Sequence, residues 1–593
     1  MTELYLQKDK EWNRVFFADG QSFRLTRENP YFTQSESYTL DVTLPMKIIE
    51  NCMLLGNLQR MERSKQPPLM KCRLLVNNKS VLNGTARVTQ VTEQAVKIQL
   101  VGGNSEANLA GSKIYIDEID MGDTSIPVSS DDYVNRNEAG VRFLYMQAYD
   151  ETADETVNQK RVFWRSDAES TVKTYLLGTK TGDAPQPALM DVLWKVIDSM
   201  GYNLGTVDPW REPWDRLFVA SAKRTANLSH TLPHWTAKEF LTNICTFFNC
   251  TLKVDPVSSA VSLQSNIDYF RNAQTVEIEP CDEYTADVAG DNDDSESDFL
   301  ANADIAFNLS SSEAHDYDCL TETIRDNVPR KVYGDERSMI LSYDSMDATI
   351  RRKYLFEYPK GICVDWRDEN GKSRRKFVDF FRPLIRNNQK ESTAKELKIV
   401  PVAITEDAKA VFVWSVKGKA TVYDITFRSL SLENPTGHEL LSDESGEAAD
   451  IQDLITGSAD VPATYEKEDL LQVFFVEDVE QPATSIDDEE PREFSALMPL
   501  TDWRYKVKGN NHRHWSLSLN DTDAQYFLGQ LHDNGFSFKM TTKYVFKFVA
   551  DRMPDPRCIF LIRGKRYGCE KIEATVTAEG YDQLMTGYFY EME

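Results

Sequence analysis

The sequence predicts an α+β protein that is rich in β-strands and divided into several domains. At 593 residues the chain is too long for one hydrophobic core, and about four domains are expected. Its 41% hydrophobic and 27% charged residues are typical of a globular, soluble protein. Short runs of alternating apolar and polar residues recur along it and predict strands, whereas few segments have the period of a helix.

Residues 1–125 are predicted to form a β-barrel or sandwich. Apolar residues alternate with polar ones at 38–44 and again at 95–103. Between these runs, residues 71–91 read as two strands around a loop at Asn77–Lys79, whose asparagines tolerate a positive φ. Several short strands with turn residues at such spacing are typical of a barrel or sandwich.

Residues 126–270 are predicted to form an inserted α/β domain. Strand-like runs precede the segment 187–201, which has the clearest helical pattern in the chain. Pro187 suits the first turn of that helix, and Gly201 suits its end. One apolar stripe at helical spacing comprises Leu189, Val192, Leu193, Val196, Ile197 and Met200.

A second helix is predicted after Thr236, because Thr236 and Glu239 have the spacing of a capping box. Asn249 suits a left-handed helix end, and strands are predicted at 250–255 and 260–264. Two adjoining apolar stripes comprise Phe240, Leu241, Ile244, Cys245, Phe247 and Phe248. This helix is therefore expected to lie in the core.

The rest of the chain is predicted to form a further mixed, β-rich domain at 271–438 and an acidic linker region at 439–499. The clearest strand of the β-rich domain is at 419–430. Within the acidic region, residues 470–476 are apolar enough for an anchored strand. The linker is thus expected to be interrupted.

Residues 500–593 are predicted to form a C-terminal α/β module. Thr522 and Gln525 have capping-box spacing and predict a helix at 523–535. Alternating strands then continue to the C-terminus, which is therefore expected to belong to a sheet.

The acidity of the chain is confined to two segments. Residues 439–493 carry 18 acidic and two basic residues, and residues 281–298 carry eight acidic residues and no base. Together they account for −24 of the net charge of −27. Such segments are typical of solvated loops or linkers, and a nucleic-acid-binding face is not supported.

Cysteine and histidine do not cluster as a zinc site or a nucleophilic site requires. His234 lies about three helical turns from Cys245, so the two cannot act as a base and nucleophile within one helix. Both are expected to serve packing. Nine scattered cysteines without a CxxC motif predict free, mostly buried thiols at 52, 72, 245, 250, 281, 319, 363, 558 and 569.

Two other motifs are incomplete. Gly371-Lys372-Ser373 resembles part of a phosphate-binding loop, but Trp366 stands where the first glycine should be, and a basic hairpin tip is expected. A contact of that tip with an acidic partner or with nucleic acid stays open. Asp291–Ser295 begins like a calcium loop, but Glu296 and Asn302 replace the required glycine and glutamate, so a solvated acidic loop is expected.

His512-Arg513-His514 with Asp521 suggests acid–base chemistry, but the other histidines, at 230, 234, 315, 438 and 532, add no third partner. We therefore predict no catalytic, cofactor-binding or metal-binding residues and no cofactor. Met1–Phe16 lacks the pattern of a secretory signal, and no apolar run approaches the ~20 residues of a membrane helix.

Three stretches, at 37–88, 235–264 and 559–592, carry a resemblance to a known family. Their order resembles the hub, or tail-associated, protein of phage tails and related contractile injection machines, of a Bacteroidales-phage type. The first two stretches, with their neighbours over about residues 1–430, resemble the opening barrel and the inserted α/β domain of hub folds. No recognisable lytic or carbohydrate-binding extension follows.

This resemblance implies a structural virion protein and not an enzyme. It implies a ring, usually a homotrimer, that closes the tail tube and joins it to the baseplate and tip. The partners expected are other copies of the chain and the tail tube, distal tail or baseplate, and tape-measure proteins, with nucleic acid only in passing through the tail lumen. The expected location is the virion tail tip, after synthesis in the host bacterial cytoplasm.

Two other classes of protein stay open. One is a tail-borne glycosidase or peptidase that acts on the host surface with carboxylates that the sequence does not pair. Turnover of host wall or capsule that a single Asp or Glu change abolishes would identify it. The other is a cytoplasmic interaction scaffold unrelated to phage, which the neighbouring genes would separate from a hub.

Overall fold

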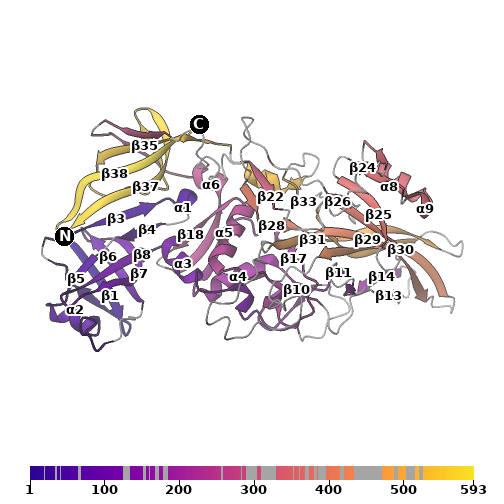
Figure 1. Cartoon of the computed structure of the whole chain (residues 1–593), viewed down its shortest axis with the longest axis horizontal. Helices are drawn as coiled ribbons and strands as arrows, with labels where there is room; N and C mark the ends of the chain where they lie inside the picture. The colour runs from indigo at the N-terminus through magenta and orange to yellow at the C-terminus, as the bar shows by residue number, and fades with distance from the viewer. Residues whose placement is uncertain are drawn as a thin grey trace, which may run out of the picture.

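The structure is a computed structural model, and it shows an elongated molecule with three parts in a row (Figure 1). Two β-lobes lie at one end, helices and a small sheet lie in the middle, and long strands lie at the other end. This arrangement confirms the β-rich, multidomain α+β class. The residues described are 1–18, 20–33, 36–39, 42–63, 69–124, 134–150, 155–158, 161–166, 172–177, 184–255, 258–281, 283–288, 304–308, 329–334, 336–351, 353–358, 361–367, 373–379, 384, 395–414, 420–432, 470–485, 492–501, 515–519, 525–533 and 535–592.

The first sheet unites the two ends of the chain. Its main path runs β2-β1-β6-β7-β8-β4-β3-β37-β38-β35-β21, so strands from the first and last predicted parts are hydrogen-bonded neighbours. The junction is β3 against β37, with Ser22 opposite Thr577 and Glu28 opposite Lys571. The five-part division of the chain stays a prediction, but its first and last parts share this sheet. Its fourteen strands are β1 (Thr2–Lys8), β2 (Glu11–Val15), β3 (Ser22–Glu28), β4 (Ser37–Thr39), β5 (Val42–Pro45), β6 (Met70–Val76), β7 (Lys79–Val91), β8 (Ala95–Gly102), β20 (Thr275–Ile278), β21 (Thr285–Val288), β35 (Phe538–Val549), β36 (Ile559–Ile562), β37 (Lys565–Thr577) and β38 (Gly580–Met592).

The predicted hairpin loop between β6 and β7 is confirmed. Asn77 and Asn78 have φ of 52° and 62°, values that asparagine adopts more readily than most residues. The Asn77 side chain also accepts a hydrogen bond from the Met1 amino group at 2.8 Å. Because the Thr2 backbone N–H donates to the Ala578 carbonyl at 2.9 Å, the start of the chain is fixed against its last hairpin.

The middle part contains both predicted helices. In α4 (Leu189–Ser199) the predicted stripe is buried, and in α5 (Ala237–Phe247) both hydrogen bonds of the predicted capping box are present. Asn249 has the expected left-handed φ of 50°. The α4 helix begins two residues later than expected, because Pro187 pairs with Phe143 in a short strand instead.

A three-stranded sheet, β16-β19-β18, accompanies these helices. The two predicted strands of this region form it with β16: β18 and β19 pair as an antiparallel hairpin, and β16 pairs in parallel with β19. The elements of the middle part are β9 (Asn135–Arg136), β10 (Arg142–Leu144), β15 (Gln186–Pro187), β16 (Asn203–Val207), β18 (Cys250–Asp255), β19 (Ala260–Ser265), α3 (Asn104–Gly111), α6 (Asn266–Arg271), and the 3-10 helices η1 (Ile116–Glu118), η2 (Trp214–Arg216) and η3 (Leu228–Thr231).

A twelve-stranded sheet forms the far part of the molecule. Strands β31 and β32 belong to it and pair in antiparallel fashion. Phe475 lies opposite Leu500 at one end of the pairing, and Ala483 lies opposite Arg492 at the other. The anchored strand expected at 470–476 is confirmed, but the described residues 471–485 and 492–500 form these two long strands and not a linker. The twelve strands are β11 (Ala148–Asp150), β12 (Glu155–Val157), β17 (Leu217–Val219), β23 (Arg330–Val332), β24 (Leu355–Tyr358), β25 (Gly361–Arg367), β26 (Ser373–Asp379), β28 (Ile399–Pro401), β29 (Ala403–Trp414), β30 (Ala420–Leu432), β31 (Leu471–Ser485) and β32 (Arg492–Leu500).

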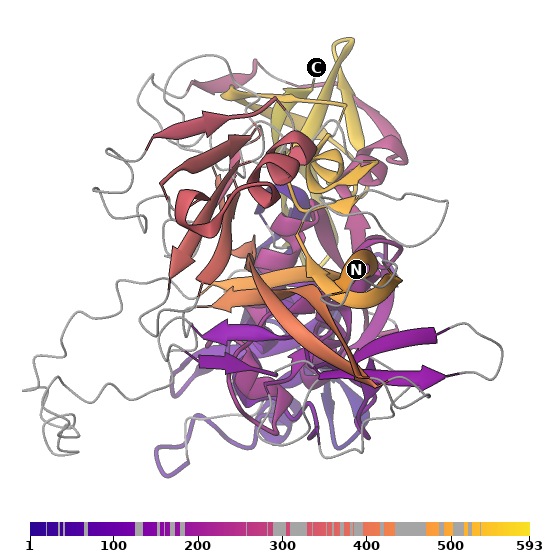
Figure 2. The same cartoon turned by 90° about the vertical axis from the view of Figure 1, so that its right-hand side faces the viewer.

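Two short helices, α8 (Glu336–Asp344) and α9 (Ala348–Arg351), lie beside β23–β26 at this far end, as Figure 2 shows. Helix α8 packs on β24 and β25 through a small core of Met339, Tyr343, Phe356, Tyr358 and Cys363. The remaining strand pairs and short helices are β13 (Arg161–Ser166) with β14 (Val172–Leu177), β22 (Ile305–Phe307) with β27 (Lys395–Leu397), β33 (Trp515–Ser516) with β34 (Tyr526–Phe527), α1 (Pro30–Thr33), α2 (Ile49–Leu54) and the 3-10 helix η6 (Leu528–His532).

The helix predicted at 523–535 is wrong over its described residues, where β34 is followed by the 3-10 helix η6. Tertiary contacts override the helical pattern. Gly529 packs so closely on the Leu519 backbone that a Cβ atom there would overlap the Leu519 carbonyl oxygen. His532 is fully buried, with Nε2 3.1 Å from the Phe247 carbonyl oxygen at the end of α5. This segment is thus joined to the middle part of the molecule.

Candidate functional site

His234 is held by two side chains from the segment around η1. Its Nδ1 lies 2.9 Å from Asp117 Oδ2, and its ring stacks on Tyr115 with centroids 4.2 Å apart. The pair orients the imidazole at the start of α5, on the opposite end of the helix from Cys245. The structure therefore does not bring the two residues together as one reactive centre.

Burial keeps the thiols of this region in their protonated form. It raises the pKa of Cys245 to about 12, and it raises the pKa of Cys250 well above the ordinary value, with the neighbouring Cys245 as a second cause. A protonated thiol is a poor nucleophile and a poor metal ligand at neutral pH. Cys245 also packs at the margin of the largest core cluster. In the described ranges, no group of three or more His, Cys, Asp or Glu residues could hold a metal ion.

Most of the other sequence candidates lie outside the described residues. This holds for Gly371-Lys372, Asp291–Ser295, His512–His514 and Asp521. Around the first of them, β25 and β26 pair with Arg367 opposite Ser373, which is the register that the expected hairpin tip requires.

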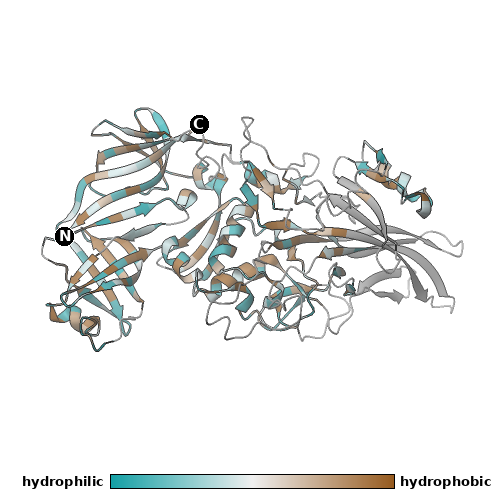
Figure 3. Cartoon of the chain, viewed as in Figure 1, coloured by the Kyte–Doolittle hydropathy of each residue, from teal (hydrophilic) through white to brown (hydrophobic). Residues whose placement is uncertain are grey.

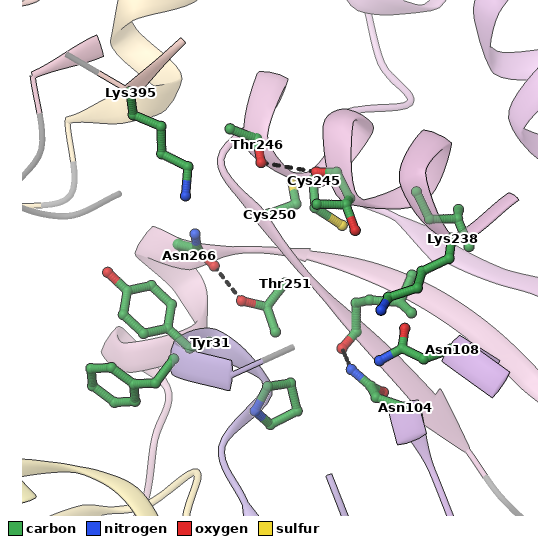
Figure 4. A pocket seen from close by; sticks show the side chains of 15 residues that line it. Tyr31, Asn104, Asn108, Lys238, Cys245, Thr246, Cys250, Thr251, Asn266 and Lys395 are labelled. Atoms are coloured by element: carbon green, nitrogen blue, oxygen red, sulfur yellow. Dashed lines mark hydrogen bonds between the residues drawn. The ribbon is translucent and has the colours of Figure 1, made fainter. Parts of the chain in front are cut away.

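A pocket of about 80 Å³ lies where separate parts of the chain meet (Figure 4). Its walls come from α1, α3, α5, β18, α6 and β27. The side chains of Lys238 and Lys395 extend into it from opposite sides. The lining residues are Pro30, Tyr31, Phe32, Asn104, Asn108, Lys238, Leu241, Thr242, Cys245, Thr246, Cys250, Thr251, Leu252, Asn266 and Lys395.

Buried amides and hydroxyls fix one wall of this pocket. The Asn104 side chain donates to the Leu252 carbonyl at 2.6 Å and accepts from the Val254 N–H at 3.1 Å, which joins α3 to β18. The Thr251 hydroxyl donates to Asn266 Oδ1 at 2.6 Å. Satisfied polar groups of this kind cost little on burial and hold the wall in one conformation. Local sequence patterns gave no sign of the pocket, because its residues come from distant segments.

A second candidate is a surface rather than a pocket. We call Trp12, Phe16, Ile49, Met53 and Met61 the α2 patch, since these exposed apolar side chains lie on β2, on α2 and in the loops that follow them. Figure 3 shows apolar residues on α2 at the outer end of the molecule. Three of them are largely solvent-exposed: Ile49 at 70%, Met53 at 68% and Met61 at 85%. Large apolar side chains that stay exposed on neighbouring elements favour an interaction surface.

The α2 patch is held rigidly against the edge of the first sheet. Asn51, fully buried in α2, accepts a hydrogen bond from the Phe16 N–H at 3.1 Å and donates to the Phe16 carbonyl at 2.9 Å. It also donates to the Pro45 carbonyl at 3.1 Å. These bonds fix the helix relative to β2 and β5.

Comparison with known proteins gives low similarities. No family model matches the chain, and no curated protein matches it. A solved structure of the 43 kDa tail protein of prophage MuSo2 from Shewanella oneidensis is 7% identical, with a TM-score of 0.31, over 99% of this chain and 97% of that chain. A tail protein from Neisseria meningitidis MC58 is 6% identical, with a TM-score of 0.31, over 100% and 96% of the two chains.

Both neighbours are tail proteins, which is the general class that the sequence resemblance names. At this TM-score, however, the likeness carries no argument about the fold or the function of this chain. Within the described residues, no helix has both the length and the apolar character needed to cross a membrane.

Proposed function

We propose that the chain is a structural phage-tail protein that assembles as a ring, a homotrimer, and forms the tail hub or baseplate tip. In that role it closes the tail tube at the virion tip and contacts the tube, distal tail or baseplate, and tape-measure proteins after synthesis in the host cytoplasm. The resemblance of residues 37–88, 235–264 and 559–592 to hub proteins supports this proposal. The structure adds one observation that favours self-assembly.

That observation is the pair of edges of the first sheet. In the part of the chain that the structure describes, β2 pairs only with β1, and β21 pairs only with β35. A strand that pairs on one side offers its other backbone groups to a further chain. Both edges also carry exposed apolar side chains, in the α2 patch and at Tyr284 and Val288 beside and on β21.

The two edges differ in charge. Residues 275–288, which hold β20 and β21, contain five acidic residues and no basic residue. Residues 8–16 and 47–63, which hold β2 and α2, contain six basic and four acidic residues. Contact between the acidic edge of one copy and the basic edge of the next is therefore favourable, whereas contact between two equal edges is not.

A contact between unlike edges is head-to-tail, and head-to-tail contacts close into rings when the rotation between copies allows it. Obligate contacts of this kind commonly bury over ~2,000 Å². The proposal thus needs both the sheet edge and the apolar residues beside it. The number of three copies comes from the family resemblance.

The native mass of the full-length protein across a wide range of concentration tests the proposal. A discrete trimer is expected, and a strict monomer at every concentration would contradict a ring that closes by itself. In this proposal the protein is not an enzyme. Turnover of host wall or capsule material that is lost on one Asp or Glu substitution would overturn that part.

A further inference from the structure

The solvent-facing side of the first sheet carries aromatic and basic side chains beside its β2 edge. Tyr5 on β1 lies opposite Arg14 of β2 on one side and opposite Arg73 of β6 on the other. Residues that lie opposite each other in an antiparallel pair point to the same face of the sheet. Trp12, which is 41% exposed, lies on this face too, because the exposed Arg73 side chain reaches its ring.

The contact between Arg73 and Trp12 holds one cation in place. The guanidinium carbon lies 4.9 Å from the ring centroid, within the range of a cation–π contact. A guanidinium held over an aromatic face keeps the N–H groups at its rim for a carboxylate. Glu3 on the same face is engaged elsewhere, with Oε1 3.1 Å from Arg14 Nη1 and with Oε2 accepting from the Tyr5 hydroxyl at 3.2 Å. In the part of the chain that the structure describes, Arg73 therefore has no carboxylate partner.

The opposite edge of the sheet, at β20 and β21, has the complementary charge. Among the described residues its exposed carboxylates form no ion pair, and Lys543, which is opposite Asp287, lies 2.8 Å from Glu570 instead. Arg563 lies over the ring of the exposed Tyr284, 5.9 Å from its centroid. The exposed carboxylates are those of Glu277, Glu279, Glu283 and Asp287. This edge of another copy is thus a source of a carboxylate for Arg73.

We propose that Arg73, held on Trp12, binds a carboxylate of the β20–β21 edge of a second copy and thereby selects that edge as its partner. This inference rests on the ring assembly proposed above and goes further, because it names the residues that give the contact its direction. Arg and Trp often dominate contacts between proteins, and a charge pair that is shielded from water there is stronger than one on an open surface. Two equal edges cannot form this pair, so Arg73 favours a head-to-tail contact over a symmetric one.

A double-mutant cycle on the full-length protein tests the proposal, with the concentration of half-assembly measured by sedimentation. Arg73→Met is expected to weaken assembly of the otherwise native chain by roughly 10-fold or more. In a neutral-edge variant the same substitution should change assembly by less than about 2-fold, because the partner charge is already absent. The neutral-edge variant combines Glu277→Gln, Glu279→Gln, Glu283→Gln and Asp287→Asn.

Arg87→Met is the matched control, and it should leave assembly unchanged. Arg87 is an exposed arginine on β7, four positions along the strand from Asn83, which lies opposite Arg73. A mixture of Arg73→Glu chains and neutral-edge chains tests the direction of the contact. Each chain then has one intact edge, so a pair joined by a single contact is expected and a ring is not.

The outcomes separate this inference from the ring itself. If the native protein assembles but Arg73→Met weakens assembly equally in both backgrounds, or no more than Arg87→Met does, the role of Arg73 is overturned and the ring stands. A ring formed by the mixture of the two variants would overturn the head-to-tail direction. A native protein that is monomeric at every concentration contradicts the ring, and this inference falls with it.

Discussion

The α2 patch gives the most direct test of ring assembly. Ile49 and Met53 are on the first and second turns of α2, and both side chains are about two-thirds exposed in the single chain. The double variant Ile49→Glu/Met53→Gln replaces the two apolar side chains and adds a negative charge to the basic edge. The substitutions leave Asn51, which fixes α2 against β2, in place.

The magnitude follows from the exposed area. Full burial of an isoleucine or methionine side chain contributes about 1.5–3 kcal/mol, so burial of the exposed two-thirds at a ring contact contributes roughly 1–2 kcal/mol for each residue. Loss of both is expected to weaken each contact by about 2–4 kcal/mol, which raises its Kd roughly 30- to 900-fold. The native mass should then shift from ring to monomer over the same concentration range.

Sedimentation of the native protein, the double variant and a control distinguishes this effect from general damage. Leu341→Gln is a suitable control, since Leu341 is 64% exposed on α8 at the opposite end of the molecule. The expected result is a lost ring for the double variant and an intact ring for the control, with equal thermal unfolding. An intact ring in the double variant would refute the placement of the contact at the α2 patch.

Three further predictions concern single residues. Asp191→Asn removes a carboxylate that accepts three hydrogen bonds within 3.0 Å from the backbone N–H and the guanidinium of Arg142. It is expected to lower the free energy of unfolding, measured by urea denaturation, by about 2–4 kcal/mol. This is less than the loss for a fully buried ion pair, because Arg142 is partly exposed. Burial raises the pKa of Glu36, so the protonated carboxyl favours the folded state at low pH, and this contribution to stability is lost as the pH rises through the raised pKa. The free energy of unfolding of Glu36→Gln should therefore exceed that of the native protein by more at pH 8 than at pH 5. The reverse order would contradict the assignment. Gly529→Ala is expected to destabilise the chain by about 1–3 kcal/mol, because the added methyl group must displace the Leu519 backbone, and unchanged denaturation would show that this contact is loose.

Local signals in the sequence identified local structure. Thr236 and Glu239 predicted the start of α5 because both partners of the capping box lie within one turn of each other, and both bonds are present in the structure. The Asn77-Asn78 turn is predictable for the same reason. The pattern at 523–535 had equal local quality, but Gly529 and His532 make close contacts with distant segments that fix a 3-10 helix instead.

Pairings between distant strands left no such signal. The sequence placed the first and last hundred residues in separate units, whereas β3 and β37 pair over seven residues across the whole length of the chain. Any strand with an apolar face could have paired with β3, so periodicity alone does not choose the partner. The acidic region misled for a related reason. Its charge indicated a linker around the strand expected at 470–476, so β32 was missed, and no local pattern indicated the distant partners β17 and β28 of β31.

The same limit explains why both candidate sites emerged only from the fold. Lys238 and Lys395 are 157 positions apart, and neither lies in a motif, so only the folded chain shows that they line one pocket. Likewise, an acidic segment at 275–288 has no evident relation to α2 until both are seen at opposite edges of one sheet. A function that depends on juxtaposed surfaces, as ring assembly does, leaves few local motifs, because each half of a contact is an ordinary stretch of exposed residues. Loss of the ring on substitution at either edge would show that both edges take part in the contact between copies.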